Sequence, residues 1–123
     1  MHPYTYSRAV NLTEAISLLS RYGERAKILA GGTDLLVQLR SDRYELDAII
    51  DVKAIPEMTD LHLGEELRIG AAVPCHRIYE DNDVATNFPG IIDSVSLIGG
   101  IQIQSRASLG GNLCNATPSA DGI

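Results

Sequence analysis

Positive charge, cysteine and long apolar runs are all scarce in this sequence. Lys and Arg total 10 against 16 Asp and Glu, so the net charge is −6. Because there is no basic run, we expect no nucleic-acid partner. The two cysteines, Cys75 and Cys114, lie far apart and form no ligand cluster with the three histidines. This pattern favours free thiols in a reducing compartment, and no metal site is predicted.

The apolar segments are short. None approaches the roughly 20 residues that a membrane helix needs, and Met1–Arg8 contain no signal-like apolar stretch. We therefore expect a cytoplasmic protein with no membrane association. The chain has 123 residues, 45% of them hydrophobic, which suffices for one globular domain. Because it stops at Ile123 directly after a glycine-rich stretch, we expect a fragment of a longer polypeptide.

The first 54 residues alternate between strand and helix patterns. The predicted strands lie at residues 3–6, 27–30 and 48–52, and the predicted helices at residues 13–22 and 33–40. Thr13 is the expected cap of the first helix, and Gly23 is its expected end. Strands that alternate with helices in this way predict a small parallel βαβ unit over residues 1–54.

The pattern changes after residue 54. Residues 60–63 and 66–69 alternate polar and apolar side chains on either side of a glycine, which is typical of a hairpin with one wet face. Further expected features are a helix start at residues 76–81, a polar loop at 81–83, a helix from Pro89 to Ile98 and an alternating segment at 101–104. We place a boundary near Ile55, so that residues 55–123 begin a second subdomain that is incomplete.

Two glycine-rich stretches are candidate ligand-binding loops. Residues 27–36 read as a buried strand, a glycine doublet and a helix start, and such a helix start binds phosphate. Residues 105–121 combine another glycine doublet with few large apolar side chains. This composition predicts a loop that approaches a polar ligand and binds an anion with backbone N–H groups. The side chains that could add hydrogen bonds are those of Ser108, Asn112, Thr117 and Asp121.

Each stretch taken alone also fits a purely structural turn. The first does not match G-x-G-x-x-G, and no Gly-Lys-Ser/Thr follows, so neither nucleotide-binding rule applies. Asp121 could equally cap a further element, and Lys27 and Arg106 could be solvated charges. No activated nucleophile and no paired carboxylates are present. No catalytic residue is predicted, and any redox chemistry would require a cofactor.

The two stretches together resemble the FAD-binding motifs of the flavoprotein subunit of molybdenum hydroxylases, the family of xanthine dehydrogenase, aldehyde oxidoreductase and carbon monoxide dehydrogenase. The matching segments are residues 28–36 and 108–121, and the resemblance extends through all 123 residues. It implies an α+β, two-subdomain FAD-binding fold of the vanillyl-alcohol oxidase type, here truncated. Gln104 and Ser105 depart from the arginine and asparagine of many members.

The resemblance also implies the cofactor-binding residues. In the first motif they are Lys27, Ile28, Leu29, Ala30, Gly31, Gly32, Thr33 and Asp34. In the second they are Ser108, Leu109, Gly110, Gly111, Asn112, Thr117 and Asp121, with Ile98 nearby. The first motif would bind the pyrophosphate, and the second would bind the pyrophosphate and approach the flavin.

The implied function is electron transfer. A molybdopterin subunit would oxidise the substrate, and [2Fe–2S] clusters on an iron–sulfur subunit would pass electrons to FAD on this chain and on to NAD⁺ or another acceptor. Two other hypotheses remain open at this point. The chain could be a fragment that binds no flavin and serves as a scaffold or interaction module, or it could be a phosphate-ligand module unrelated to flavins.

Overall fold

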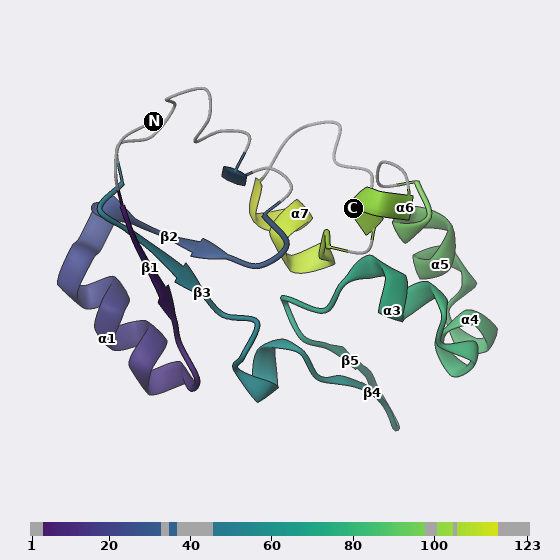
Figure 1. Cartoon of the computed structure of the whole chain (residues 1–123). Coiled ribbons are helices and arrows are strands. Elements are labelled where there is room, and N and C mark those ends of the chain that lie inside the picture. Colours follow the sequence, from purple (N-terminus) through teal and green to yellow (C-terminus); the bar gives the residue numbers. More distant parts are fainter. Residues whose placement is uncertain (1–3, 33–34, 37–45, 98–100, 105, 116–123) are drawn as a thin grey trace.

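The computed structural model describes residues 4–32, 35–36, 46–97, 101–104 and 106–115. A small sheet with one long helix forms one side of the molecule, and a group of short helices with a hairpin forms the other (Figure 1). Helices and strands are therefore mixed, as the sequence predicts. Among the described residues, no helix is long and apolar enough to cross a membrane.

The sheet has three parallel strands. They are β1 (Thr5–Arg8), β2 (Ala26–Leu29) and β3 (Ala48–Asp51), in the order β1-β3-β2. Thr5 and Ala26 both pair with Ala48, so the three strands end at the same edge. The predicted parallel arrangement is confirmed, although the first strand begins two residues later than expected. All four residues of β3 are buried.

Helix α1 (Leu12–Tyr22) begins two residues earlier than a cap at Thr13 implies. The expected cap at Thr13 is wrong, because Asn11 is the N-cap and its side-chain oxygen accepts from the Glu14 N–H at 2.8 Å. Thr13 lies inside the first turn, where its side chain is too far along the helix to serve as the cap. Gly23 ends the helix with φ of 56°, as predicted.

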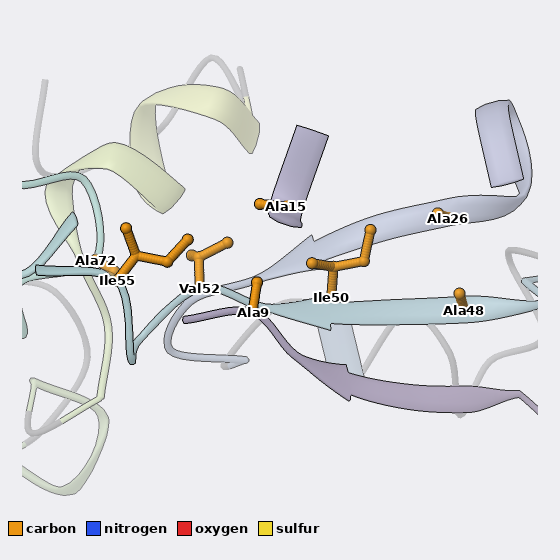
Figure 2. Close-up of a cluster of buried hydrophobic side chains, with 8 residues drawn as sticks. All are labelled: Ala9, Ala15, Ala26, Ala48, Ile50, Val52, Ile55 and Ala72. Carbon is orange, nitrogen blue, oxygen red and sulfur yellow. The ribbon is translucent and has the colours of Figure 1, made fainter. Parts of the chain in front are cut away.

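Small side chains allow α1 to pack closely on the sheet. The buried cluster between them contains Ala9, Ala15, Ala26, Ala48, Ile50, Val52, Ile55 and Ala72. Figure 2 shows that this row continues from Ala48 and Ile50 along the chain to Ile55 and Ala72. The opposite face of the sheet buries Leu29, Leu46 and Ile49. Both faces of the central strand β3 are therefore covered.

The chain after β3 forms the predicted hairpin and a series of short helices. The hairpin strands are β4 (Leu61–Leu63) and β5 (Leu67–Ile69), which pair antiparallel. The helices are α3 (Cys75–Tyr79), α4 (Asn82–Asn87), α5 (Pro89–Val95), α6 (Ile101–Gln104) and α7 (Leu109–Asn115), and short 3-10 turns occupy Gly23–Arg25 and Pro56–Met58.

Three predictions in this part of the chain are wrong. The polar loop expected at residues 81–83 is the start of α4, because Asp81 accepts from the N–H groups of Asp83 and Val84 at 3.0 Å and caps the helix. The alternating segment 101–104 is helix α6. The glycine-rich segment expected to be a loop is helical over Leu109–Asn115, because Ser108 caps it.

The predicted end of α5 is also wrong. The helix begins at Pro89 as expected but ends at Val95, and Ile98 lies outside the described residues. Gln104 is buried, and its amide donates to the carbonyl of Ser96 at 2.8 Å. Ser96 directly follows α5, and its carbonyl has no N–H partner within that helix. The Gln104 amide supplies the missing hydrogen bond.

The short helices share a second core. It consists of Val73, Cys75, Ile78, Val84, Val95 and Ala107, with the hairpin side chains packed against it. Burial raises the pKa of the Cys75 thiol, which keeps this side chain uncharged and suited to an apolar core. Of the helix predicted at residues 33–40, only Leu35 and Leu36 are described. Both are helical, and Leu36 N–H donates to Gly32 O at 3.1 Å.

Replacing Ile50 with Ala should reduce the free energy of unfolding by about 2–5 kcal/mol, because it leaves a cavity in the core beneath α1. Ile50 is 0% exposed. The matched control is Ile16→Ala on the outer side of α1, where Ile16 is 61% exposed and a change within about 0.5 kcal/mol is expected. Urea unfolding of both variants tests this. Equal losses would contradict the assignment of the core.

Candidate functional site: the edge where the two glycine segments meet

The site begins where the parallel strands end. Open parallel sheets bind ligands beyond the carboxyl ends of their strands, and β2 leads at that edge directly into Gly31 and Gly32. Gly32 has φ of 80°, a conformation that favours glycine. A Cβ atom there would also lie 3.0 Å from Leu29 Cδ1 and 3.1 Å from Leu36 Cδ1. Gly32 is therefore required to form the turn itself.

The two glycine segments touch each other at Gly31. A Cβ atom on Gly31 would overlap the carbonyl oxygen of Arg106 and lie 2.6 Å from its carbonyl carbon. Only a glycine lets the backbone of the first turn rest against the backbone at Arg106 and Ala107. Figure 1 shows the chain that leaves β2 passing beside α7. The tertiary structure therefore brings together two motifs that are far apart in the sequence.

Ser108 is a structural residue of the second motif. It is 3% exposed, and its hydroxyl oxygen accepts from Gly111 N–H at 3.0 Å. A bridge between Ser108 and Pro74 and a bond of 2.7 Å from Cys75 N–H to Ala107 O tie this segment to the start of α3. Its oxygen therefore caps α7, and the ligand hydrogen bond that the sequence predicts for Ser108 stays a prediction.

Gly110 is required for packing. A Cβ atom on Gly110 would lie 2.5 Å from Ala71 O and 2.8 Å from Ala71 Cα, so the first turn of α7 rests directly on the chain at Ala71. Gly111, by contrast, is exposed. The glycine doublet therefore has one member that faces protein and one that faces outward.

Sequence reasoning missed a polar cluster behind the first glycine turn. Asp51, the last residue of β3, accepts hydrogen bonds from the Tyr6 hydroxyl and from Lys53 N–H, the latter at 2.9 Å. The Lys53 ammonium lies 3.0 Å from Asp51 Oδ2 and donates to the carbonyl oxygen of Ala30 at 3.0 Å. The available signal was a lone carboxylate ending an otherwise apolar strand at the carboxyl edge of the sheet.

The Asp51 carboxyl group of this cluster is held in its charged form. Burial by itself would raise the pKa of Asp51, which is 4% exposed, but the hydrogen bonds from Tyr6 and Lys53 and the charge of Lys53 together lower it. The hydrogen bond to Asp51 raises the pKa of Tyr6. Asp51 therefore remains a carboxylate and Tyr6 a hydrogen-bond donor around neutral pH, so both can hold Lys53 and the turn in place.

The implied cofactor-binding residues lie in different surroundings. Gly31 and Gly32 come together with the segment from Ser108 to Gly111 at one edge of the sheet. The side chains of Leu29, Ala30 and Leu109 pack in or against the cores, whereas Lys27 and Ile28 are exposed on β2. Outside the described residues lie Thr33, Asp34, Ile98, Thr117 and Asp121. Asn112 belongs to α7.

The arrangement fits an anionic ligand. Within the described part of the chain, no backbone carbonyl accepts from the N–H groups of Gly31 or Gly32. The ammonium of Lys53 lies behind the same turn and is paired with the buried carboxylate of Asp51. Backbone N–H groups with a nearby cation suit a diphosphate.

Comparison with known proteins identifies the family. Residues 2–123 match the family described as the FAD-binding domain in molybdopterin dehydrogenase. The chain therefore belongs to this family of FAD-binding domains, and the resemblance seen in the sequence is confirmed.

Individual relatives agree with this assignment. The putative xanthine dehydrogenase FAD-binding subunit of Escherichia coli strain K12 is 40% identical over 121 residues, which are 95% of this chain and 40% of that protein. The carbon monoxide dehydrogenase medium chain of Hydrogenophaga pseudoflava is 28% identical over 119 residues, which are 96% of this chain and 42% of that protein. The chain thus spans about two fifths of the length of each of these two relatives.

Solved structures show the same fold. Carbon monoxide dehydrogenase from Hydrogenophaga pseudoflava, in a form that lacks the Mo-pyranopterin moiety, matches with a TM-score of 0.92 and 27% identity over 99% of this chain and 43% of that chain. Quinoline 2-oxidoreductase from Pseudomonas putida 86 matches with a TM-score of 0.85 and 26% identity over 92% of this chain and 40% of that chain.

Replacing Tyr6 with Phe should raise the pKa of Asp51, because the carboxylate loses a hydrogen-bond donor. A lowered folded-state pKa contributes stability that is present above the unfolded pKa and is lost as pH falls through the folded pKa. On acidification, the variant should therefore lose the stability that the Asp51 carboxylate contributes at a higher pH than the wild type does. The total loss should also be smaller, because the pKa of Asp51 is then closer to its unfolded value. Urea unfolding measured from about pH 6 to about pH 2 tests this.

Tyr22→Phe is the matched control for that experiment. Tyr22 packs against the core beneath α1. Its replacement by Phe should therefore leave the acid part of the stability profile unchanged. Identical profiles for the Tyr6 variant and the wild type would show that the Tyr6 hydroxyl does not stabilise the Asp51 carboxylate.

Proposed function

We propose that this chain forms part of the FAD-binding, electron-transfer subunit of a molybdenum hydroxylase complex. In this role it binds FAD and passes electrons from [2Fe–2S] clusters through that cofactor to NAD⁺ or another acceptor. FAD supplies the redox centre, whereas the residues of this chain bind it, orient it and exclude water. The family assignment and the FAD-binding subunits among the relatives support this proposal.

The observation that carries the proposal is the contact between the two glycine segments. The Gly31 backbone rests against the backbone at Arg106, directly before the helix that Ser108 caps. A single extended anionic cofactor could contact both motifs at this edge. We propose that the segments Lys27–Asp34 and Ser108–Asn112 bind it together with Ile98, Thr117 and Asp121.

We further propose that the fold is of the vanillyl-alcohol oxidase type, with residues 1–54 and 55–123 contributing to two subdomains and FAD between them. The two cores support this division, although the first core also includes Ile55 and Ala72 from beyond residue 54. One core lies beneath α1 and the other among the short helices, and the glycine segments meet where the two parts of the chain come together (Figure 1).

The proposed partners are an iron–sulfur subunit and a molybdopterin subunit of the same complex. Medium chains and FAD-binding subunits of multi-subunit dehydrogenases among the relatives support this. We also propose a cytoplasmic location, which the free thiols of Cys75 and Cys114 favour.

The first test is the absorbance spectrum of the protein purified with its partner subunits. A bound-flavin spectrum is expected, with one FAD per chain after extraction. If no flavin is present, even after FAD is added to the purified complex, the proposed function is wrong and the scaffold hypothesis is favoured.

Replacing Gly31 with Ala should lower FAD affinity by about five- to a hundredfold, because the new methyl group overlaps the Arg106 carbonyl and forces the two segments apart. An overpacked contact of this kind typically costs about 1–3 kcal/mol, and about 1.4 kcal/mol corresponds to a tenfold change in affinity. Titration of the flavin-depleted complex with FAD, followed by flavin fluorescence, measures the affinity.

Gly90→Ala is the matched control. Gly90 lies in α5, and a Cβ atom there would meet nothing within 4 Å. Since Ala is also a better helix former than Gly, this variant should bind FAD as the wild type does. Equal affinities for the Gly31 and Gly90 variants would show that the contact at Arg106 does not shape the cofactor site.

A further inference from the structure

Lys53 connects the central strand to the first glycine turn. It follows β3 by two residues, yet its ammonium reaches across to the carbonyl oxygen of Ala30, directly before Gly31, at a distance of 3.0 Å. Ala30 itself leaves the end of β2, the neighbouring strand. A single side chain therefore ties the ends of two strands together at the edge where the cofactor segments meet.

Holding the Ala30 carbonyl also orients the next N–H group. The described peptide bonds are all trans, and in a planar trans peptide the N–H points opposite to the C=O. Because Lys53 fixes the direction of the Ala30 carbonyl, it fixes the direction of the Gly31 N–H, which then points away from Lys53. An N–H group held in one direction before a ligand arrives loses less entropy when the ligand binds.

Lys53 is itself held in place by Asp51. The ammonium lies 3.0 Å from Asp51 Oδ2, and the Lys53 N–H donates to Asp51 Oδ1 at 2.9 Å. The Tyr6 hydroxyl of β1 donates to the same carboxylate. The Asp51 side chain is 5% exposed and the Lys53 side chain 35%, so the carboxylate is buried while the lysine side chain remains partly exposed.

We propose that Lys53, anchored by Asp51, is a positioning residue for the diphosphate of FAD. It fixes the Ala30–Gly31 peptide so that its N–H is available to the anion, and it adds a positive charge beside the turn. An ammonium group has three N–H donors, and the contacts to Asp51 and Ala30 use two of them. This inference rests on the proposed function, because it assumes that the first glycine turn binds FAD.

The test uses the complex with its partner subunits, depleted of FAD and titrated with FAD. Lys53→Met should weaken FAD binding by about ten- to a hundredfold, the range expected when hydrogen bonds to a charged group are lost. Lys53→Arg should recover most of the affinity, because it keeps the charge and the donors. Arg68→Met is the charge-matched control on the exposed hairpin strand β5, and wild-type affinity is expected.

The salt dependence separates a direct electrostatic role from a merely structural one. Salt screens the attraction between the ammonium and the diphosphate, so the affinity of the wild type should fall more steeply with added salt than that of Lys53→Met. If Lys53→Met does not fold, Asp51→Asn replaces it. This variant keeps the ammonium but loses the charge that anchors it, and it should weaken FAD binding at least about threefold, a modest fraction of the loss of a charged hydrogen bond.

Two outcomes would overturn the inference while leaving the proposed function intact. One is wild-type FAD affinity in Lys53→Met, or in Asp51→Asn where that variant replaces it. The other is a loss that Arg does not rescue and that leaves the salt dependence unchanged. A wild-type complex that takes up no FAD would instead overturn the proposed function, and this inference with it.

Discussion

The complete burial of β3 is the constraint on which the rest of this structure depends. A central parallel strand must be covered on both faces, and here α1 packs through Ala15 on one face while Leu29, Leu46 and Ile49 fill the other. The parallel register then brings the ends of all three strands to one edge. The polar residues that end or follow these strands are thereby gathered at that edge.

The second constraint is the close backbone contact at Gly31. The second glycine segment is fixed from behind by the bridge to Pro74 and by the contact of Gly110 with Ala71. The first turn can therefore meet it only if no side chain intervenes. The glycines thus serve three different purposes: Gly32 supplies a backbone conformation, Gly31 and Gly110 allow backbone contact, and Gly111 leaves an exposed surface.

Buried charge at this edge has a structural explanation. A carboxylate at the end of a buried strand is costly unless it is paired and hydrogen-bonded, and Asp51 is satisfied by Tyr6 and Lys53. This arrangement joins all three strands, because Tyr6 lies on β1, Asp51 on β3, and Lys53 reaches the residue after β2. The same contacts that offset the burial of Asp51 also fix the glycine turn.

Local pattern in the sequence determined the parallel strands, α1, the hairpin and the family, because these depend on residues that are close in the chain or on whole motifs. The cap of α1 was expected at Thr13 and is Asn11, and residues 81–83 were expected to be a loop although Asp81 caps α4, because short polar residues fit a helix start or a loop until the backbone path is known. Only the tertiary structure decided that Ser108 caps α7, that Gly31 rests on Arg106 and that Lys53 reaches Ala30. The last two contacts join residues far apart in the sequence, and the cap requires a segment that packing against Pro74 and Ala71 makes helical. The packing of distant segments therefore determines what Ser108, Gly31 and Lys53 contact. The local sequence around each residue does not determine these contacts.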